Sequence, residues 1–304
     1  MVANILLLLV TALLFPGTVA VVKAKIVGRK GPVVLQYVYD IVKLFKKGSV
    51  YSSCSSVLFQ LAPLVYFSSV FLALFFIPIG NQEAFLSFEG DFVLFAYLLG
   101  LGRFLMILAA MDTGSGFEGM GANREAFYSL LIEPAFFIVF GSIALLTGKT
   151  SFFEIFSALH VETVLSYFVA VLSIYVLFWV SMVENSRLPV DDPKTHLELT
   201  MVHEVMILDH SGFELALIQM ASGLKFAIYG TLIFNMILPI QSSLIIQLFL
   251  YFPVQGLYAI TVGCVETFRA RNKMAINAQW IITFMALSII GFISALIITG
   301  KINI

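Results

Sequence analysis

The chain has 304 residues, of which 60% are hydrophobic and 12% are charged, and its formal net charge is −1. A soluble globular domain carries about twice that share of charged residues, so the composition excludes the ordinary soluble classes. The two cysteines, Cys54 and Cys264, lie far apart in the sequence and have no CxxC or histidine partner. This argues against a disulfide framework, an iron–sulfur site or a zinc site.

Apolar runs of about 20 residues recur along the whole chain, and each is long enough to cross a hydrocarbon core about 30 Å thick. The first run, 2–22, resembles a signal peptide but lacks a basic start, so we expect a retained helix. The sequence therefore predicts an all-α polytopic membrane protein with a single membrane domain, 1–304. Its eight predicted spans are 2–22, 57–79, 92–110, 126–147, 163–183, 213–238, 243–263 and 276–299.

The basic residues gather on one side of these spans. If the N-terminus is outside, 14 of the 17 lysines and arginines fall at loops or helix ends on the inner side. The positive-inside rule then predicts that both termini lie outside, with cytoplasmic loops at 23–56, 111–125, 184–212 and 264–275. We find no internal repeat, which disfavours transporters built from duplicated halves.

The segment 29-RKGPVVLQYVYDIVKLFKKG-48 is neither a span nor an open loop. Pro32 can start a helix there and Gly48 can end it. The apolar residues share one helical face and the polar residues share the other: Leu35, Val38, Val42 and Phe45 against Gln36, Asp40, Lys43 and Lys47. This pattern predicts an amphipathic helix in the cytoplasmic interface, either as a surface anchor alone or with a further role.

Three charged residues lie well inside predicted spans, away from the span ends, where each charge costs several kcal/mol unless it is paired or hydrated. Glu133 is followed by Pro134, which leaves a backbone carbonyl free one turn back and makes a proton or water site plausible. Arg103 lies at a similar depth in another span, so a structural Arg103–Glu133 pair is the alternative interpretation. Lys225 is the deepest charge, about 18 Å along its helix, too far for its side chain to reach the bilayer surface.

The stretch 184–212 is rich in acids and histidines. His203-Glu204 begins like HExxH, but the next histidine is His210, seven residues on, and His196 and His203 are also seven apart. Seven residues span about 10.5 Å of helix, which is too far for one ion and argues against a metal site. Pro189 and Pro193 predict a turn before a short helix over 194–208. Because many residues between the acids are apolar, we expect this loop to fold back against the bundle instead of standing in water.

No Walker loop, no GxGxxG that opens a helix and no Ser–His–Asp arrangement is found in the sequence, so we expect no catalysis by this chain alone. Five stretches, taken in order, resemble the membrane subunit of respiratory complex I that sits beneath the quinone site. They also resemble its relatives in energy-converting [NiFe] hydrogenases and formate hydrogenlyases. The stretches are 29–48, 121-GANREAFYSLLIEP-134, 184-ENSRLPVDDP-193, 198-ELTMVHE-204 with 209-DHSG-212, and 265-VETFRARNKM-274.

This resemblance implies a membrane subunit in the inner (cytoplasmic) membrane that docks a peripheral arm. The arm would supply iron–sulfur clusters, with or without a NiFe centre, and a hydrogenase-like large subunit, while this chain binds no cofactor or metal itself. The other expected partners are antiporter-like membrane subunits and lipid, with a quinone as a partner in the quinone-reducing alternative, but no nucleic acid. The residues expected to couple or translocate ions are Glu133, Glu184, Asp191, Glu198, Glu204, Lys225 and Arg103. Those expected to dock the arm are Arg29, Lys30, Gly31, Pro32, Asp40, Lys43, Arg124, Arg187, Arg269 and Arg271.

Within this resemblance, the stretches 190–212 and 111-MDTGSGFEGMGANREAF-127 look more like the hydrogenase and formate hydrogenlyase branch than the quinone-reducing branch. Many relatives carry an acid early in the sixth span, where this chain has Gln219 and Ser222, which leaves open whether a carboxylate chain is interrupted there. Two further hypotheses remain beside a coupling subunit: a purely structural anchor, and a stand-alone secondary transporter.

Overall fold

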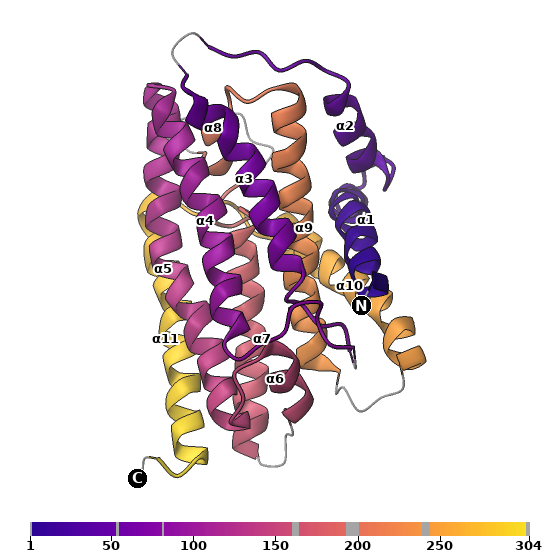
Figure 1. Cartoon of the computed structure of the whole chain (residues 1–304), viewed down its shortest axis with the longest axis vertical. Coiled ribbons are helices and arrows are strands. Elements are labelled where there is room, and N and C mark those ends of the chain that lie inside the picture. Colours follow the sequence, from indigo (N-terminus) through magenta and orange to yellow (C-terminus); the bar gives the residue numbers. More distant parts are fainter. Residues whose placement is uncertain are drawn as a thin grey trace.

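The structure, a computed structural model, describes residues 2–52, 55–80, 82–159, 164–192, 201–238 and 244–301. Within these ranges it contains eleven helices (Figure 1). They are α1 (Val2–Ile26), α2 (Gln36–Phe45), α3 (Val57–Leu74), α4 (Asp91–Asp112), α5 (Gly116–Thr147), α6 (Phe152–Ala158), α7 (Val164–Glu184), α8 (His203–Met206), α9 (Gly212–Ile237), α10 (Leu244–Phe268) and α11 (Met274–Ile298).

Eight of these helices are long and apolar enough to cross a membrane, namely α1, α3, α4, α5, α7, α9, α10 and α11. This confirms the prediction of an all-α polytopic membrane protein with eight spans. An even number of spans places both chain ends on the same side of the membrane, and the assignment of that side to the outside stays a prediction. Most helix ends differ from the predicted ones by a few residues, as expected for bounds taken from hydropathy alone.

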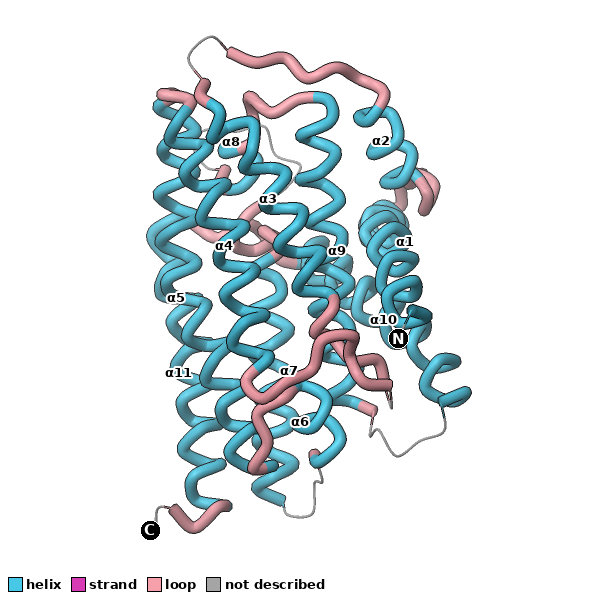
Figure 2. The backbone as a smooth tube through the Cα atoms, in the orientation of Figure 1, coloured by secondary structure: helices cyan, strands magenta, loops and turns pink. Residues whose placement is uncertain are grey.

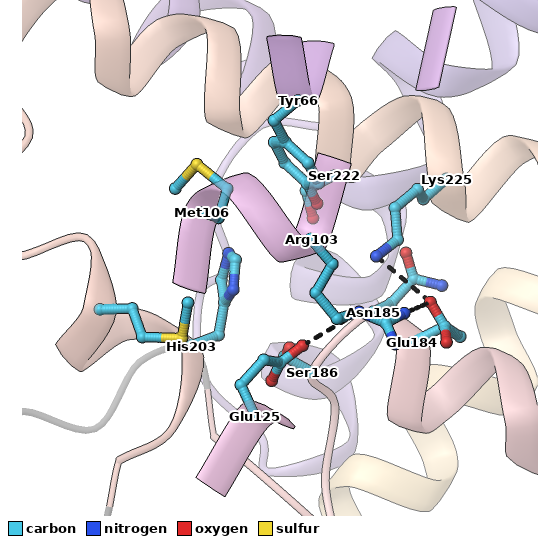
Figure 3. A pocket seen from close by; sticks show the side chains of 11 residues that line it. Tyr66, Arg103, Met106, Glu125, Glu184, Asn185, Ser186, His203, Ser222 and Lys225 are labelled. Atoms are coloured by element: carbon cyan, nitrogen blue, oxygen red, sulfur yellow. Dashed lines mark hydrogen bonds and ion pairs between the residues drawn. The ribbon is translucent and has the colours of Figure 1, made fainter. Parts of the chain in front are cut away.

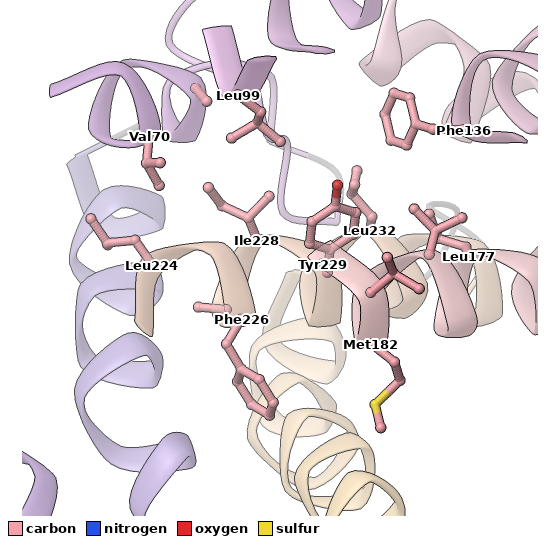
Figure 4. Packing of buried hydrophobic residues seen from close by; sticks show 14 of the residues in the cluster. Val70, Leu99, Phe136, Leu177, Met182, Leu224, Phe226, Ile228, Tyr229 and Leu232 are labelled. Atoms are coloured by element: carbon pink, nitrogen blue, oxygen red, sulfur yellow. The ribbon is translucent and has the colours of Figure 1, made fainter. Parts of the chain in front are cut away.

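Helix α9 is the central helix of the bundle. Within its most apolar 18-residue window, 83% of the residues are buried, against 33–44% for the other seven spans. Its Leu224, Ile228 and Leu232 pack toward Val70 of α3 and Leu99 of α4 (Figure 4). A position at the centre of α9 is therefore shielded from lipid on every side by neighbouring helices.

Six of the other spans pack in pairs, and α7 packs against α5, α9 and α11. α1 packs with α10, α3 with α4, and α5 with α11, and Figure 1 shows the α1–α10 pair on the opposite side of the bundle from α5 and α11. Tyr229 and Phe226 of α9 point in different directions, Tyr229 toward Phe136 of α5 and Phe226 toward the helices that include α10 (Figure 4). The two halves of the bundle thus meet across α9.

Helix α5 begins ten residues earlier than the predicted span 126–147, so the predicted loop 111–125 is mostly helical. The glycines of this stretch suggest a loop in the sequence, but Gly121 lets α5 pack closely against the segment 202–206. A Cβ atom at Gly121 would overlap with Val205 Cγ1 and would lie 2.8 Å from the Val202 carbonyl oxygen. With 32 residues, α5 is about 48 Å long and extends well past a hydrocarbon core of about 30 Å.

The amphipathic helix forms where the sequence placed it but is shorter, because α2 starts at Gln36 and ends at Phe45. Only Ile41 of α2 is fully buried, whereas Leu35, Tyr39 and Val42 are exposed. The segment before α2 lies directly on α1, since a Cβ atom at Gly17 would overlap with the Val34 carbonyl oxygen. The exposed apolar face is consistent with the predicted position in the membrane interface.

The stretch after α7 runs through the inside of the bundle. Asn185, Ser186, Val190 and Asp191 are all less than 9% exposed, and Figure 2 shows loop backbone within the bundle behind α4. In the described parts of this loop, up to residue 192 and from residue 201, the chain packs against the bundle as predicted. The predicted helix over 194–208 is much shorter among the described residues, where α8 covers only His203–Met206, and Glu198 lies outside the described residues.

Candidate functional site: a buried charge cluster and its cavities

Five charged side chains from four helices meet at the centre of the bundle, and Figure 3 shows Arg103, Glu125, Glu184 and Lys225 among them. Arg103 of α4 donates through Nη1 to Glu133 Oε1 at 3.1 Å and through Nη2 to Glu184, and its Nε lies 3.5 Å from Glu125 Oε1. Lys225 Nζ lies 3.4 Å from the same Glu184 oxygen. We call these five residues the charge cluster.

Helix geometry explains why the cluster forms at this depth. Lys225 is the fourteenth of the 26 residues of α9, and Arg103 is the thirteenth of the 22 residues of α4. Glu184 is the last residue of α7, which ends inside the bundle and not at its surface. The two acids of α5, Glu125 and Glu133, are eight residues apart and therefore share one helical face.

The cluster contains two cations and three carboxyl groups. If all five are ionised its net charge is −1, and one bound proton makes it neutral. Because a net charge is costly in a low-dielectric interior, the cluster is suited to hold one exchangeable proton. Arg103 donates hydrogen bonds to Glu133 and Glu184 and forms an ion pair with Glu125, so the simple Arg103–Glu133 pair considered from the sequence is only part of the arrangement.

Glu133 connects the cluster to the outer surface of the bundle. Its side chain is 46% exposed, whereas those of Arg103, Glu184 and Lys225 are buried. A cavity of about 50 Å³, here the lateral cavity, lies beside it and is lined by Tyr97, Gly100, Arg103, Glu133, Glu184 and Tyr229. One carboxyl of the cluster is thus open to whatever covers the surface formed by α4 and α5.

Two further cavities lie on the other side of the cluster. The inner cavity, about 20 Å³, is lined by Arg103, Glu125, Glu184, His203, Ser222 and Lys225, among others. The α2 cavity, about 280 Å³, lies between α1, α2, α8 and α9, and its charged lining residues are Lys23, Asp40, Arg187, Glu204 and Glu266. A polar cavity needs roughly 10–15 Å³ to hold a water molecule, so even the inner cavity has room for one.

Glu204 of α8 lines the α2 cavity, and the pKa of its carboxyl group is raised. Burial, with the nearby Asp191 carboxylate as a smaller cause, raises the pKa of Glu204 to about 7. The adjacent His203 is shifted in the opposite direction, because burial and the Lys225 cation lower its pKa to about 4. At neutral pH the carboxyl is therefore close to its titration midpoint while the imidazole is neutral.

Asp191 holds the loop together and is not part of the charge cluster. Its carboxylate accepts hydrogen bonds from the backbone N–H of Asp192 (2.9 Å) and His203 (2.9 Å) and from Arg271 Nη2 (2.8 Å). Its side chain is 1% exposed, and burial raises the pKa of Asp191 although these hydrogen bonds oppose the shift. This carboxylate ties α8 to the segment between α10 and α11.

A second ion-paired group, which the sequence interpretation missed, lies in the wall of the α2 cavity. Glu266 of α10 pairs with Lys23 of α1 at 2.8 Å and with Arg187 Nη1 at 3.2 Å. Arg187 also lies over the Phe226 ring, at 5.6 Å from the centroid. Glu266 falls within the stretch 265–274 that carries the family resemblance, but its partners are 79 and more residues away.

The predicted docking residues divide into two groups. Six lie on exposed backbone at or near α2: Arg29, Lys30, Gly31, Pro32, Asp40 and Lys43. The four arginines farther along the chain contact other residues of this chain through their side chains. Arg124 donates to the Met201 carbonyl at 2.8 Å, Arg187 and Arg271 pair as described, and Arg269 lies over the Trp179 ring at 5.3 Å.

Three more buried acids had not been selected from the sequence. Glu125 belongs to the charge cluster, and Glu118 accepts from the Asp209 backbone N–H at 3.2 Å. Glu214, in the first turn of α9, lies 3.1 Å from His210 Nδ1, so an acid is present early in this span after all. The spacing Glu118–Glu125–Glu133, seven and eight residues, would have placed all three acids of α5 on one face.

Among the described residues, no group of three or more histidine, cysteine, aspartate or glutamate side chains is arranged to hold a metal ion. Lys225 and Arg103 occupy the positions next to the buried carboxylates that a cation would need. The residues present in the cluster therefore fit proton exchange better than metal binding.

Comparisons with known proteins identify the family of the chain. A family model described as NADH dehydrogenase matches residues 1–298. Hydrogenase-4 component C of Escherichia coli is 31% identical over 237 residues, which cover 78% of this chain and 74% of that protein. Formate hydrogenlyase subunit 4 of the same organism is 28% identical over 220 residues, 72% of this chain and 71% of that protein.

A quinone-linked relative and one solved structure extend these similarities. A subunit of the NADH-quinone oxidoreductase of Bacillus cytotoxicus is 27% identical over 196 residues, 64% of this chain and 56% of that protein. One chain of the membrane-bound sulfane sulfur reductase, an archaeal respiratory membrane complex, has the same fold. It superposes with a TM-score of 0.81 at 21% identity over 96% of this chain and 98% of that one. The chain described here belongs to the NADH dehydrogenase family.

Proposed function

We propose that this chain is the membrane anchor and coupling subunit of a complex I-like, group 4 hydrogenase-type oxidoreductase in the cytoplasmic membrane. It would dock a peripheral arm carrying iron–sulfur clusters and a hydrogenase-like large subunit, and link electron transfer there to proton or sodium movement. The relatives named hydrogenase-4 component C and formate hydrogenlyase subunit 4 support this branch over the quinone-reducing one.

The observation that carries the proposal is the charge cluster with its surplus carboxyl group. A bundle that only anchors other subunits has no need for five charges at its centre, because replacing them by apolar side chains is neutral or stabilising in many proteins. The cluster lies between a cavity near the predicted cytoplasmic side and a half-exposed Glu133 carboxyl. This is the arrangement expected of a protonation site that senses events at one end and passes them to a neighbour at the other.

The surface around Glu133 supports an antiporter-like neighbour at this position. Tyr97, Phe104 and Leu130 on α4 and α5 are 67%, 56% and 70% exposed. A half-exposed carboxyl among such residues is costly against lipid tails and favourable against a polar group of another subunit. The membrane partner would therefore contact α4 and α5, while the peripheral arm would contact the exposed basic segment 29–43.

Glu133→Gln in the assembled complex tests this function. The variant keeps the size of the side chain and removes its titration, so we expect normal assembly and electron transfer with a lower ratio of ions moved to electrons passed. Glu154→Gln is a matched control, because Glu154 is an exposed acid on α6 that pairs with Lys149 at 3.6 Å, far along the chain from the cluster. An unchanged ratio in Glu133→Gln would favour a purely structural anchor.

The α2 cavity favours one alternative, a membrane subunit that binds a quinone. Its volume of about 280 Å³ approaches the lower end of small-molecule pockets, and its walls combine apolar Pro16, Val19 and Ile207 with Tyr37 and Asp40. A quinone function predicts that the isolated complex reduces a soluble quinone analogue and that Tyr37→Phe slows this reaction. The hydrogenase-type function predicts no such activity.

A further inference from the structure

The α2 cavity and the inner cavity share four lining residues. These are Asn185, Ser186, His203 and Ser222. Asn185, Ser186 and Ser222 are neutral at every accessible pH, so His203 is the one titratable side chain that borders both spaces among the described residues. A direct path for protons between the two cavities therefore runs past these four groups.

His203 is held in position by its backbone and not by its ring. Its N–H donates to Asp191 Oδ2 at 2.9 Å, and the Asp191 carboxylate is fixed in turn by Arg271. Figure 3 shows the imidazole at the edge of the inner cavity, next to Met106 and on the opposite side of Arg103 from Lys225. The backbone of His203 therefore fixes where the ring lies, and the ring borders the space lined by the charge cluster.

The charges around the ring come from every element that packs against it. Asp191 and Glu204 lie on its own segment, Lys225 on α9, Arg103 on α4, and Glu125 and Glu184 border the same inner cavity from α5 and α7. Across the α2 cavity lie Asp40 and the Lys23–Glu266–Arg187 group. Burial first, and then the Lys225 and Arg103 cations of the cluster, disfavour an imidazolium at this place and keep the ring neutral.

We propose that His203 is the relay through which protons pass between Glu204 in the α2 cavity and the charge cluster. This inference rests on the proposed coupling function and names the residue that connects its two ends. One ring nitrogen of the neutral imidazole accepts a proton from the α2 cavity, while the N–H of the other nitrogen gives its proton to a water molecule in the inner cavity. The proton reaches a carboxylate of the cluster, the ring remains neutral, and a ring flip restores the first tautomer.

The relay also answers the question raised by Gln219 and Ser222. Ser222 borders both cavities but has no carboxyl group, and Gln219 borders only the α2 cavity, where its backbone carbonyl accepts from the Tyr37 hydroxyl. The gap between the carboxyl of Glu204 and those of the cluster is thus bridged by an imidazole. A histidine can both accept and donate a proton, which the amide of a glutamine cannot do at neutral pH.

The test compares His203→Gln with His210→Gln in the assembled complex, reconstituted in vesicles. His210 is the matched control because it lies in the same segment and is also buried, but it stacks on Phe59 at 4.0 Å between ring centroids and borders neither cavity. Both variants keep the backbone N–H groups, including the one that binds Asp191. We expect the ratio of protons moved to electrons passed to fall at least about tenfold in His203→Gln and to stay unchanged in His210→Gln.

A second variant separates relay from structure. His203→Ala opens the α2 cavity toward the inner one, so added imidazole is expected to restore the ratio, whereas a role in packing alone would not respond to it. A normal ratio in His203→Gln, an equal fall in both glutamine variants, or no recovery with imidazole would each overturn the relay. If Glu133→Gln lowers the ratio while His203→Gln does not, only the relay fails; if neither does, the coupling function fails with it.

Discussion

Lys225 and Glu184 meet at the centre of the helix bundle, where the Lys225 Nζ lies 3.4 Å from a carboxylate oxygen that also accepts from Arg103. Each residue is less than 7% exposed. Neither could remain charged in this interior without the other groups of the cluster, since an isolated buried charge is far more costly than a paired one. The cluster is thus a single electrostatic unit, and removing any member changes its proton content or its stability.

Lys225→Met is expected to destabilise the protein by about 3–5 kcal/mol, because it leaves three carboxyl groups facing one cation. Adding Glu125→Gln restores the original charge balance and should recover part of this loss. The measurement is the thermal unfolding midpoint of the detergent-solubilised protein for the two single variants and the double variant. A double variant no more stable than Lys225→Met would show that charge balance does not govern the cluster.

Glu204 is expected to make stability depend on pH below neutrality. Burial raises the pKa of Glu204 to about 7, so between its ordinary value and about 7 the folded state binds more protons than the unfolded state. The free energy of unfolding should therefore fall as the pH rises through this window and level off above it. Glu204→Gln should remove this part of the slope; an unchanged pH profile in thermal unfolding would contradict the assignment.

Asp191→Asn should loosen α8 and the loop that follows α7. The change removes the charge that binds Arg271 and weakens the bonds from the Val202 and His203 N–H groups, and a hydrogen bond to a charged group contributes about 1.5–3 kcal/mol. Faster hydrogen exchange in residues 201–207 is the expected readout. Asp192→Asn serves as control, and equal exchange in the two variants would show that Asp191 is not the anchor.

Gly121 and Gly119 offer a matched pair on α5. An added methyl group at Gly121 would collide with Val205 and the Val202 carbonyl, whereas at Gly119 it would meet nothing within 4 Å. We expect Gly119→Ala to stabilise the helix by up to about 1 kcal/mol and Gly121→Ala to destabilise the protein by about 1–3 kcal/mol. Thermal unfolding of the two variants checks this, and a stable Gly121→Ala would mean that α8 does not rest on α5.

Hydropathy was sufficient to predict the spans and three of the five cluster residues. Arg103, Glu133 and Lys225 are recognisable because each is a charged residue in an apolar run, where an unpaired charge would be energetically costly. Glu125 was missed because it falls in a glycine-rich stretch that resembles a loop. A carboxylate in a solvent-exposed loop has no desolvation cost, so it attracts no attention in the sequence. In the structure α5 starts at Gly116, and Gly121 lies close against α8, so that stretch is buried helix.

The pairings of the loops could not be predicted from a single sequence. Asp191 and Arg271 are 80 residues apart, and Glu266 and Lys23 are separated by most of the chain. No local periodicity encodes such contacts, since they arise from the packing of α1, α10 and α11 around the segment after α7. The sequence placed Asp191 among the ion-path acids; its hydrogen bonds support the different role of an anchor, with His203 beside it.

The most direct test of coupling is whether a buried carboxyl of the cluster changes its protonation state during turnover. Infrared difference spectra of the assembled complex, recorded as electrons enter, report the carbonyl stretch of a protonated carboxyl group. Coupling through the cluster predicts a turnover-dependent band that is altered in each of the variants Glu125→Gln, Glu133→Gln and Glu184→Gln. Spectra identical to the wild type in all three variants would contradict it.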